Sequence, residues 1–290
     1  MHIGLTFFPT ADSIHPAVLA RALEERGFES LWLAEHSHIP ESPATPGPPG
    51  RGEGGLPREY YAVADPFVAL GMVAAVTTRL KLATGICLVA QRDVFQTAKQ
   101  VASLDALSGG RFLFGVGAGW NAPELADHGT PFEERFAVMR ERIAAMKQLW
   151  SAEKAEYHGQ HVDFGPSYAW PKPLQQPHPP IHMGGAGITA IRRAVAYCDG
   201  WVPLYSENET APLALVPQLQ EALAAAGRDT DAFELTLYFC PPTDEVVAKC
   251  QEAGATRVLF PLPSLPESEA LAVLDGYAKR IAWDPVLKPC

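Results

Sequence analysis

The stretch SGGRFLFGVGAGWN, residues 108–121, decides the fold of this chain. It starts with the end of a helical pattern, continues as an apolar, strand-like run over Arg111–Val116, and ends in a loop. Glycines stand at alternate positions, Gly115, Gly117 and Gly119. Glycine lowers the stability of a strand, so three of them indicate a backbone that approaches something flat or charged. A helix, a strand and a glycine loop in this order are typical of α/β proteins that bind ligands at strand ends.

The rest of the sequence repeats this alternation of strand and helix. The predicted strands, eight in all, are Ile3–Phe7, Ser30–Ala34, Lys81–Val89, Arg111–Val116, Ile181–Gly184, Gly200–Pro203, Glu234–Phe239 and Arg257–Leu262. Strands that are joined by helices run parallel. Eight such units in 290 residues predict an α/β protein, a (β/α)8 TIM barrel that forms a single domain over residues 1–290. A doubly wound parallel sheet is the alternative that the pattern leaves open.

Helix boundaries are marked by capping residues. The first helix is predicted over His15–Arg26, with Gly27 as its terminator. Asp65-Pro66 predicts the start of a second helix, because an N-cap aspartate precedes a proline at the first helical position. The sequence Thr130-Pro131-Phe132-Glu133 predicts a later helix start through a capping box. The buried residues of that later helix are expected to be Val138, Met139, Ile143, Met146 and Leu149.

Two segments interrupt the alternation. One lies at about 38–62 and contains PESPATPGPPGRGEGGLP, residues 40–57, whose prolines and glycines exclude helix and strand. It follows the second strand, so we expect it at the C-terminal mouth of the barrel, either as a lid over substrate or as a loose surface loop. The other segment, at about 154–180, has a hairpin pattern over Ala155–His158 and His161–Phe164 and is expected to be an insertion before the fifth strand.

Composition argues against several classes of function. A formal charge of −10 disfavours nucleic acid and anionic membranes as main partners. The N-terminus lacks the basic and apolar regions of a signal peptide, and no apolar run reaches the roughly 18 residues that span a bilayer. Five scattered cysteines without a CxxC pair favour reduced thiols over disulfides or a zinc site. We therefore expect a cytoplasmic protein without a metal.

A charged pair, Glu35-His36, follows the apolar end of the second strand. In a barrel this position lies at the C-terminal mouth, and histidine is the usual acid or base near neutral pH. His36 is therefore the candidate catalytic residue. The alternative is a loop histidine that only makes hydrogen bonds. His38 nearby would suit a metal, but no remote third ligand accompanies the two histidines.

Two further segments carry glycine where a ligand could approach the backbone. Gly85 interrupts the third strand, which indicates a bulge, a ligand against the backbone, or a gap filled by a neighbouring side chain. The segment IHMGGAGI, residues 181–188, leads from a strand into a helix whose free N–H groups would suit a phosphate. Neither this segment nor GVGAGW, residues 115–120, matches the dinucleotide motif GxGxxG. The motifs GxSxG, HExxH and Walker A do not occur, which disfavours the common hydrolases, zinc proteases and nucleotide triphosphatases.

Four separated motifs occur in one order along the chain. They are EERGFESLWLAEH (residues 24–36), QTAKQVASLDALSGGRFLFGVGAGW (96–120), TPFEERF (130–136), and IHMGGAG followed by AVAYCDGWVP (181–187 and 194–203). Together they resemble the luciferase-like monooxygenase superfamily, whose barrel enzymes bind FMN or the deazaflavin coenzyme F420. The resemblance covers nearly the whole chain, although the last third, after Pro203, matches in pattern only.

This resemblance implies roles for the residues at matching positions. His36 corresponds to a histidine beside the reactive ring carbon, and Glu35 corresponds to an acidic residue that contacts the cofactor. Gly85-Ile86 corresponds to a bulge behind the ring, which often holds a non-prolyl cis peptide. The remaining implied contacts are the glycine loop near the ring and ribityl chain, Ala118 and Gly119, and the phosphate loop, Gly184, Gly185, Gly187 and Ile188.

Trp120 departs from one branch of this family. Relatives that resemble the deazaflavin sugar-phosphate dehydrogenase carry a glutamate at this position as proton acceptor. Tryptophan cannot exchange protons, which disfavours that substrate and that mechanism. We expect Trp120 to lie in the cofactor site and to stack on a small apolar or aromatic substrate.

The function implied by the resemblance is an oxidoreductase that transfers a hydride between coenzyme F420 and a small organic substrate. His36 would supply one proton, while the redox chemistry belongs to the cofactor. FMN is the alternative cofactor, and with it the reaction would be a monooxygenation of the bacterial luciferase type. A third alternative is a non-catalytic protein that only binds the flavin or deazaflavin. Relatives commonly pair through helices early in the barrel, so the resemblance also implies a homodimer.

Overall fold

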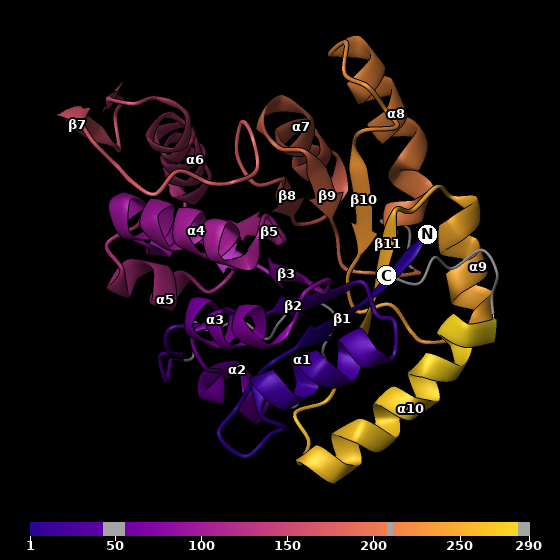
Figure 1. Cartoon of the computed structure of the whole chain (residues 1–290). Helices are drawn as coiled ribbons and strands as arrows, with labels where there is room; N and C mark the ends of the chain where they lie inside the picture. The colour runs from indigo at the N-terminus through magenta and orange to yellow at the C-terminus, as the bar shows by residue number, and fades with distance from the viewer. Residues whose placement is uncertain (43–55, 208–210, 284–290) are drawn as a thin grey trace.

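The structure is a computed structural model that describes residues 1–42, 56–207 and 211–283 (Figure 1). Side chains are described up to residue 279. Most of the proline- and glycine-rich segment at 40–57, with the lid or loop expected there, lies outside the described residues. Cys290 lies outside them as well.

Eight parallel strands close into a barrel at the centre of the molecule (Figure 1). In their order around the barrel they are β1 (His2–Phe7), β2 (Ser30–Leu33), β3 (Lys81–Thr84), β5 (Phe112–Gly117), β8 (Ile181–Gly184), β9 (Gly200–Val202), β10 (Glu234–Leu237) and β11 (Arg257–Leu262). The last strand pairs with the first over its whole length, from His2↔Arg257 to Phe7↔Leu262, which closes the ring. The predicted (β/α)8 barrel is confirmed, and the doubly wound sheet, which would have two free edges, is wrong.

Helices connect the strands and surround the barrel (Figure 1). The helices are α1 (Pro16–Glu25), α2 (Arg58–Ala62), α3 (Pro66–Val76), α4 (Val94–Ser108), α5 (Ala122–Asp127), α6 (Arg135–Ser151), α7 (Gly187–Tyr197), α8 (Val216–Ala225), α9 (Asp244–Glu252) and α10 (Glu267–Trp283), with short 3-10 turns η1 (Val89–Gln91) and η2 (Pro212–Leu215). Helix α10 returns beside α1, so the two ends of the fold meet on one side of the barrel (Figure 1).

Most of the predicted helix boundaries agree with the structure. Asp65 caps α3 by accepting a hydrogen bond from the Val68 amide at 3.0 Å. Helix α1 is followed by Gly27 in the left-handed conformation, at a φ of 81°. Gly109 ends α4 in the same conformation, at a φ of 75°. These signals are local, because each depends on the chemistry of one or two residues beside the helix end.

The capping box predicted at 130–133 is wrong. Helix α6 begins at Arg135, and the preceding residue makes no side-chain capping bond. The Thr130 hydroxyl donates to the Ala90 carbonyl at 2.6 Å, so this side chain ties the turn to the 3-10 segment η1. The residues expected to be buried in α6 are buried: Val138, Met139, Ile143, Met146 and Leu149.

The hairpin predicted after α6 is present, with a shifted second strand. Strand β6 (Ala155–His158) pairs with β7 (Asp163–Ser167) in antiparallel register. The second strand starts two residues later than predicted, because the amides of His161 and Val162 donate to the Glu141 carboxylate at 2.7 and 3.2 Å. The insertion is thereby attached to α6.

A network of charged side chains fills the N-terminal end of the barrel. Arg257, which begins β11, is fully buried and donates to both carboxylate oxygens of Glu29 at 2.6 and 2.7 Å. The same guanidinium donates to Glu234 at 2.8 Å, and Lys81 lies 3.0 Å from Glu29. Burial by itself raises the pKa of Glu29, but Arg257 and Lys81 hold that pKa well below its usual value. Each charge in this network therefore has a partner, which buried charges require.

His182 lies inside the barrel close to this network. It is fully buried, and its ring lies edge-on to the Trp32 ring with 5.5 Å between centroids. Its Nε2 is 3.5 Å from a Glu234 oxygen, yet neither ring nitrogen has a hydrogen-bond partner among the described residues. Burial lowers the pKa of His182 to about 4, so the ring is neutral at physiological pH.

Candidate functional site

The candidate site lies at the opposite, C-terminal end of the barrel. His36 follows β2 and Trp120 follows β5, so the loops after these strands bring them together. Their rings are 5.5 Å apart and meet at 78°. Two of the residues that the sequence predicted for one site are thus in contact across the mouth of the barrel.

His36 is held by a carboxylate that the sequence did not point to. Its side chain is 5% exposed, and its Nδ1 lies 2.9 Å from Oε2 of Glu124, whose side chain is fully buried. The other oxygen of Glu124 accepts the Ser37 amide at 3.3 Å. An ionised carboxylate only accepts hydrogen bonds, so Nδ1 of His36 is the donor. The Nε2 atom is then the ring nitrogen that can exchange a proton with a ligand.

No sequence signal would have paired Glu124 with His36. Glu124 stands in the first turn of α5, where its backbone amide donates to the Asn121 side chain at 3.4 Å. Acidic residues are common in the first turn because they complement the helix dipole. The sequence therefore has an ordinary explanation for a carboxylate there. Only the fold brings it beside a histidine 88 positions earlier.

Aromatic side chains pack around this histidine. Tyr60 of α2 lies 5.6 Å from the His36 ring and 6.4 Å from the Trp120 ring, between centroids. Phe8, which follows β1, lies 4.9 Å from Tyr60 and stacks at 6.4 Å on Phe239. Phe239 follows β10 and has a φ of 57°, a left-handed conformation in a residue other than glycine. The mouth thus combines one imidazole with apolar ring surface from helix α2 and from the loops after β1, β5 and β10. We call these five residues, His36 and the four aromatic ones, the aromatic mouth.

Both oxygens of the Glu35 carboxylate interact with other groups of the protein. One oxygen accepts the Leu88 amide at 2.6 Å, and the other is paired with Arg92. Arg92 also donates to Gln100 at 2.9 Å. These bonds hold β4 (Cys87–Leu88), the short strand that follows the interruption of β3, against the end of β2. The contact between Glu35 and a cofactor stays a prediction.

The interruption of β3 contains the cis peptide that the family resemblance implied, Gly85-Ile86. The Gly85 amide donates to the Leu33 carbonyl at 2.6 Å, and the hydroxyl of Tyr238 donates to the Gly85 carbonyl. A Cβ at Gly85 would lie 2.8 Å from a ring carbon of Tyr238 and 3.0 Å from Trp32. Gly85 is therefore needed for close packing at this bulge, whatever binds in front of it.

The glycines of the first loop have protein neighbours. A Cβ at Gly115 would lie 2.0 Å from the Thr84 carbonyl, and one at Gly117 would lie 2.1 Å from Cδ1 of Ile86. A Cβ at Gly184 would meet the same Ile86 atom at 2.6 Å. Glycine at 115 and 117 is thus explained by strand and side chain that already occupy that space, and the approach of a flat or charged ligand to this backbone stays a prediction. Whether Ile86 and Gly184 also contact a cofactor stays a prediction.

Two features of the site offer unused hydrogen-bond donors. The Gln91 amide nitrogen is buried without a partner among the described residues, and it would lie 3.3 Å from a Cβ at Gly119. Helix α7 starts at Gly187 without a side-chain cap, after Gly185 at a φ of 101°. The free N–H groups at such a helix start attract phosphate. Ala118, also predicted for the site, is buried beside Gly119, and Ile188 at the helix start is 39% exposed.

His38 is occupied by hydrogen bonds at the rim of the site. Its two ring nitrogens lie 2.9 Å from the Ser37 hydroxyl and 3.0 Å from Asp127. In the described parts of the chain, no three histidine, cysteine or acidic residues are grouped to hold a metal ion. The same parts contain no helix with the length and apolar character needed to cross a membrane.

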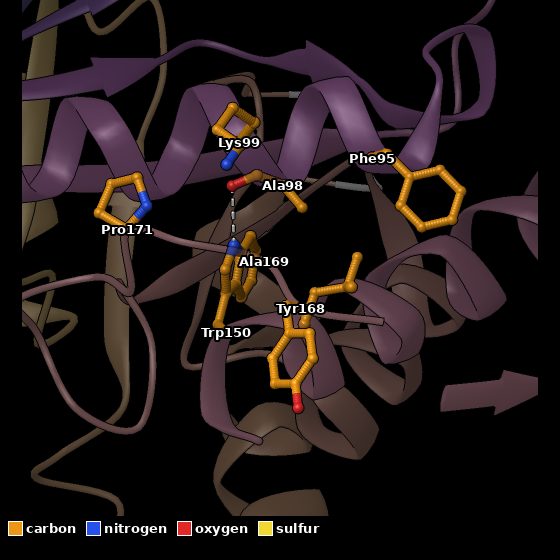
Figure 2. Close-up of a pocket in the computed structure, with 8 residues that line it drawn as sticks. Phe95, Ala98, Lys99, Trp150, Tyr168, Ala169 and Pro171 are labelled. Carbon is orange, nitrogen blue, oxygen red and sulfur yellow. Dashed lines mark hydrogen bonds between the residues drawn. The ribbon is translucent and has the colours of Figure 1, made fainter. Parts of the chain in front are cut away.

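A small cavity of about 130 Å³ lies on the outside of the barrel (Figure 2). It is lined by side chains of α4 and α6 and by the segment that follows β7, among them Phe95, Trp150 and Tyr168. Figure 2 shows the Trp150 indole N–H donating to the Ala98 carbonyl, at 3.0 Å, across this cavity. None of the predicted site residues lines it, so we interpret it as a gap beneath the insertion.

Comparison with known proteins finds similar sequences over most of the chain. A family model described as luciferase-like monooxygenase matches residues 11–281. An uncharacterized protein of Mycobacterium tuberculosis is 40% identical over 285 residues, covering 97% of this chain and 99% of that protein. An F420-dependent glucose-6-phosphate dehydrogenase of Kineococcus radiotolerans is 30% identical, covering 92% and 76% of the two chains.

Another relative is named for a different cofactor, reduced FMN. An FMNH2-dependent dimethylsulfone monooxygenase of Pseudomonas putida is 29% identical, covering 63% of this chain and 48% of that protein. Among solved structures, monooxygenase RslO1 of Streptomyces bottropensis superimposes with a TM-score of 0.78 at 22% identity, covering 97% and 99% of the chains. This structural likeness supports the barrel fold.

Proposed function

The chain belongs to the luciferase-like monooxygenase family, and on this premise we propose that it transfers a hydride between coenzyme F420 and a small organic substrate. The observation that carries the proposal is the His36–Glu124 pair at the base of the aromatic mouth. A buried carboxylate that orients an imidazole is the arrangement of a proton donor or acceptor. The apolar rings that pack beside this histidine would form the surface that binds the substrate.

The unused donors of the site fit a phosphorylated cofactor of the flavin type. The uncapped start of α7 offers backbone N–H groups to a phosphate, as the residues Gly185, Gly187 and Ile188 were predicted to do. The buried Gln91 amide beside Gly119 offers a hydrogen bond to a carbonyl or hydroxyl acceptor. When bound, the cofactor would supply a ring carbon that gives or accepts a hydride.

The chain's own residues then have separate tasks. Nε2 of His36 takes the proton that leaves the substrate with the hydride, or returns it in the reverse direction. Glu124 keeps the proton of Nδ1 in place and stabilises the ring when it becomes an imidazolium. Trp120 and Tyr60 bind apolar substrate surface and exclude water from the reacting atoms. The pair of Glu35 with Arg92 fixes β4, and with it the Gly85-Ile86 bulge.

FMN is the second candidate cofactor, and the reaction would then be a monooxygenation. The dimethylsulfone monooxygenase among the relatives favours this alternative, and a phosphate at the start of α7 would suit FMN equally. The two candidates differ in their use of oxygen. Reduced deazaflavin reacts negligibly with oxygen, whereas reduced FMN in such a site would consume it.

Titration of the purified protein with F420 and with FMN, followed by absorbance, tests the proposal. We expect saturable binding of F420 and much weaker binding of FMN. Adding alcohols and aromatic substrates without oxygen should then bleach the oxidised deazaflavin. Saturable binding of FMN alone, with oxygen consumption on reduction, would make the protein a monooxygenase. Binding of neither cofactor would refute both candidates.

The homodimer implied by the family also stays a proposal. Two apolar side chains on one face of α3 support it, because Val68 is 64% exposed and Met72 is 42% exposed. Helix α3 is one of the early helices of the barrel, through which relatives were expected to pair. Light scattering after size exclusion should give twice the chain mass of 31.3 kDa for the wild-type protein. The variant Val68→Glu should give the mass of a single chain.

A further inference from the structure

Two cysteine side chains lie in contact next to one residue of the aromatic mouth. Cys240 follows β10, and Cys250 lies in the last turn of α9. Their Sγ atoms are 3.6 Å apart, and both side chains are fully buried. Among the described residues, Cys87 and Cys198 form no such thiol pair. The 240–250 pair is therefore the place in the described part of the chain where two thiols can react with each other.

The segment that carries the two cysteines can bring them closer. The sulfur atoms of a disulfide are about 2 Å apart, so the two Sγ atoms must approach each other by about 1.5 Å. Residues 241–243, which connect Cys240 to α9, form neither helix nor strand. Helix α9 has nine residues and lies on the outside of the barrel (Figure 1). A shift of this loop and helix can supply the approach without moving the strands.

The thiol pair lies close beneath the surface of the protein. Pro241 and Pro242, which follow Cys240, are half-buried, and Thr243 is exposed. Lys249, beside Cys250 in α9, is exposed as well. A short outer helix and its loop open more readily than the strands of a core. A molecule as small as hydrogen peroxide therefore needs only a local opening to reach the sulfur atoms.

The contact between the thiols also favours reaction at Cys250. The hydrogen bond from Cys240 lowers the pKa of Cys250 although burial opposes it, and the same bond raises the pKa of Cys240. Burial raises the pKa of Cys87 and of Cys198, which lack a thiol neighbour among the described residues. The thiolate is the form of cysteine that attacks a peroxide. Cys250 is thus the thiol of the described residues that is best suited to react first.

Phe239 connects this pair to the aromatic mouth. It directly precedes Cys240 and has a φ of 57°, a conformation that a residue other than glycine keeps only where its surroundings hold it. Its ring stacks on Phe8 at 6.4 Å between centroids. The Cys240 amide donates to the Leu259 carbonyl at 2.8 Å, which fixes the backbone beside Phe239. A displacement of Cys240 towards α9 therefore acts on the Phe239 ring.

We propose that Cys240 and Cys250 form a reversible disulfide in the presence of a hydroperoxide, and that this disulfide moves Phe239 within the aromatic mouth. The Cys250 thiolate attacks one peroxide oxygen, the O–O bond breaks, and the departing hydroxide takes up a proton to become water. The Cys240 sulfur then attacks the resulting sulfenic sulfur. The S–S bond forms, the S–O bond breaks, and the hydroxyl leaves as water with the proton of the Cys240 thiol.

The balance of this reaction is complete. The two thiols are oxidised by loss of two electrons, and the peroxide is reduced to two molecules of water. A dithiol reductant such as dithiothreitol reverses the step by thiol–disulfide exchange. The proposal goes beyond the proposed function, because it holds whichever cofactor the mouth accepts.

Peptide mass spectrometry without reduction tests the bond. The purified protein is treated with hydrogen peroxide, its remaining thiols are blocked before unfolding, and the digest is searched for linked peptides. We expect a Cys240–Cys250 link, with loss of two of the five thiols and their recovery with dithiothreitol. Cys250→Ala should remove the link, whereas the control Cys198→Ala, which lacks another buried thiol, should keep it.

Near-ultraviolet circular dichroism, which reports the packing of aromatic rings, tests the effect on the mouth. We expect the wild-type spectrum to change on oxidation and to return on reduction, and the Cys250→Ala spectrum to stay constant. Phe239→Leu should form the same disulfide with a smaller spectral change. Thermal unfolding checks that each variant is folded.

Four results would overturn the proposal. The first is a wild-type protein without a Cys240–Cys250 link after peroxide treatment, including one in which Cys250 is oxidised to a sulfinic acid instead. The second is a link that dithiothreitol does not reverse. The third is a disulfide that leaves the near-ultraviolet spectrum unchanged. The fourth is a spectral change of equal size in Phe239→Leu, which would place the effect away from the aromatic mouth.

Discussion

The two ends of the barrel differ in how their charged side chains are arranged. At the N-terminal end, the buried Arg257 and Glu29 pair with each other and with the more exposed Glu234 and Lys81. At the C-terminal end, the His36–Glu124 pair stands beside the aromatic mouth, and the Nε2 atom of His36 has no hydrogen-bond partner within residues 1–42, 56–207 and 211–279. The first arrangement stabilises the barrel, and the second is suited to chemistry. In barrels of this kind, the C-terminal face carries activity and the other face carries stability.

Substitution at the aromatic mouth should have the largest effect, and this effect should be a decrease in turnover. His36→Ala removes the proposed acid or base, so turnover of any substrate accepted by the wild-type protein should fall about 100- to 10,000-fold. Cofactor affinity should change little, whereas the free energy of unfolding should fall by about 1–3 kcal/mol, because the buried Glu124 carboxylate loses its imidazole donor. Stopped-flow measurement of cofactor reduction checks this expectation, and unchanged turnover would remove His36 from the mechanism.

Glu124 provides the matched variant for that test. Glu124→Gln keeps the size of the side chain and a hydrogen-bond acceptor for Nδ1, but removes the negative charge. The ¹⁵N chemical shifts of His36 should show a proton on Nδ1 in the wild-type protein. Turnover in Glu124→Gln should fall less than in His36→Ala, because the ring is still oriented but its charged form loses its partner. A proton found on Nε2 alone would contradict the arrangement.

Substitution at the opposite end should act on stability alone. Arg257→Met leaves the Glu29 carboxylate buried without its main partner, which costs about 3–5 kcal/mol of the free energy of unfolding. Urea unfolding measures this loss. Lys81→Met is the control, because the Lys81 side chain is 38% exposed and its loss should cost less than about 1 kcal/mol. Equal effects of the two variants would show that burial of the network is not what matters.

His182 gives the barrel interior a pH dependence of its own. Its pKa is lowered from 6.5 to about 4 by burial. Between these two pH values, the imidazole is mostly protonated in the unfolded chain and mostly neutral in the folded chain. The free energy of unfolding is therefore highest above pH 6.5. It falls by about 3 kcal/mol in total as the pH is lowered towards 4. Unfolding free energies measured across this range should show the slope. His182→Leu should flatten it, and an equal slope in that variant would assign the effect elsewhere.

The smallest predicted effect concerns the glycines beneath the mouth. Gly117→Ala would place a methyl group against Ile86, so it should cost about 1–3 kcal/mol of stability. Ile86→Ala in the same chain makes room for that methyl group and should recover part of the loss. Thermal unfolding of the single and double variants measures the coupling. Additive effects would mean that Ile86 is not the neighbour that requires glycine.

The fold could be predicted because its signals are short-range. The apolar run before Gly117 and the caps at Asp65 and Gly109 depend on neighbouring residues and on hydrophobic period. The capping box at 130–133 failed because the Thr130 hydroxyl found a partner on another segment, the Ala90 carbonyl. The site could be predicted only in part. Strand ends located His36 and Trp120, whereas Phe8 and Phe239 had no motif to mark them.

The sequence by itself determined the alternation of eight strands with helices, the position of His36 at a strand end, and the family. Tertiary structure alone decided that Glu124 orients His36 and that Ile86 explains two of the glycines. The physical reason is the separation of the interacting residues along the sequence. Periodicity and helix caps depend on residues that are close in sequence, whereas a contact between distant residues forms only after the strands have closed into a ring.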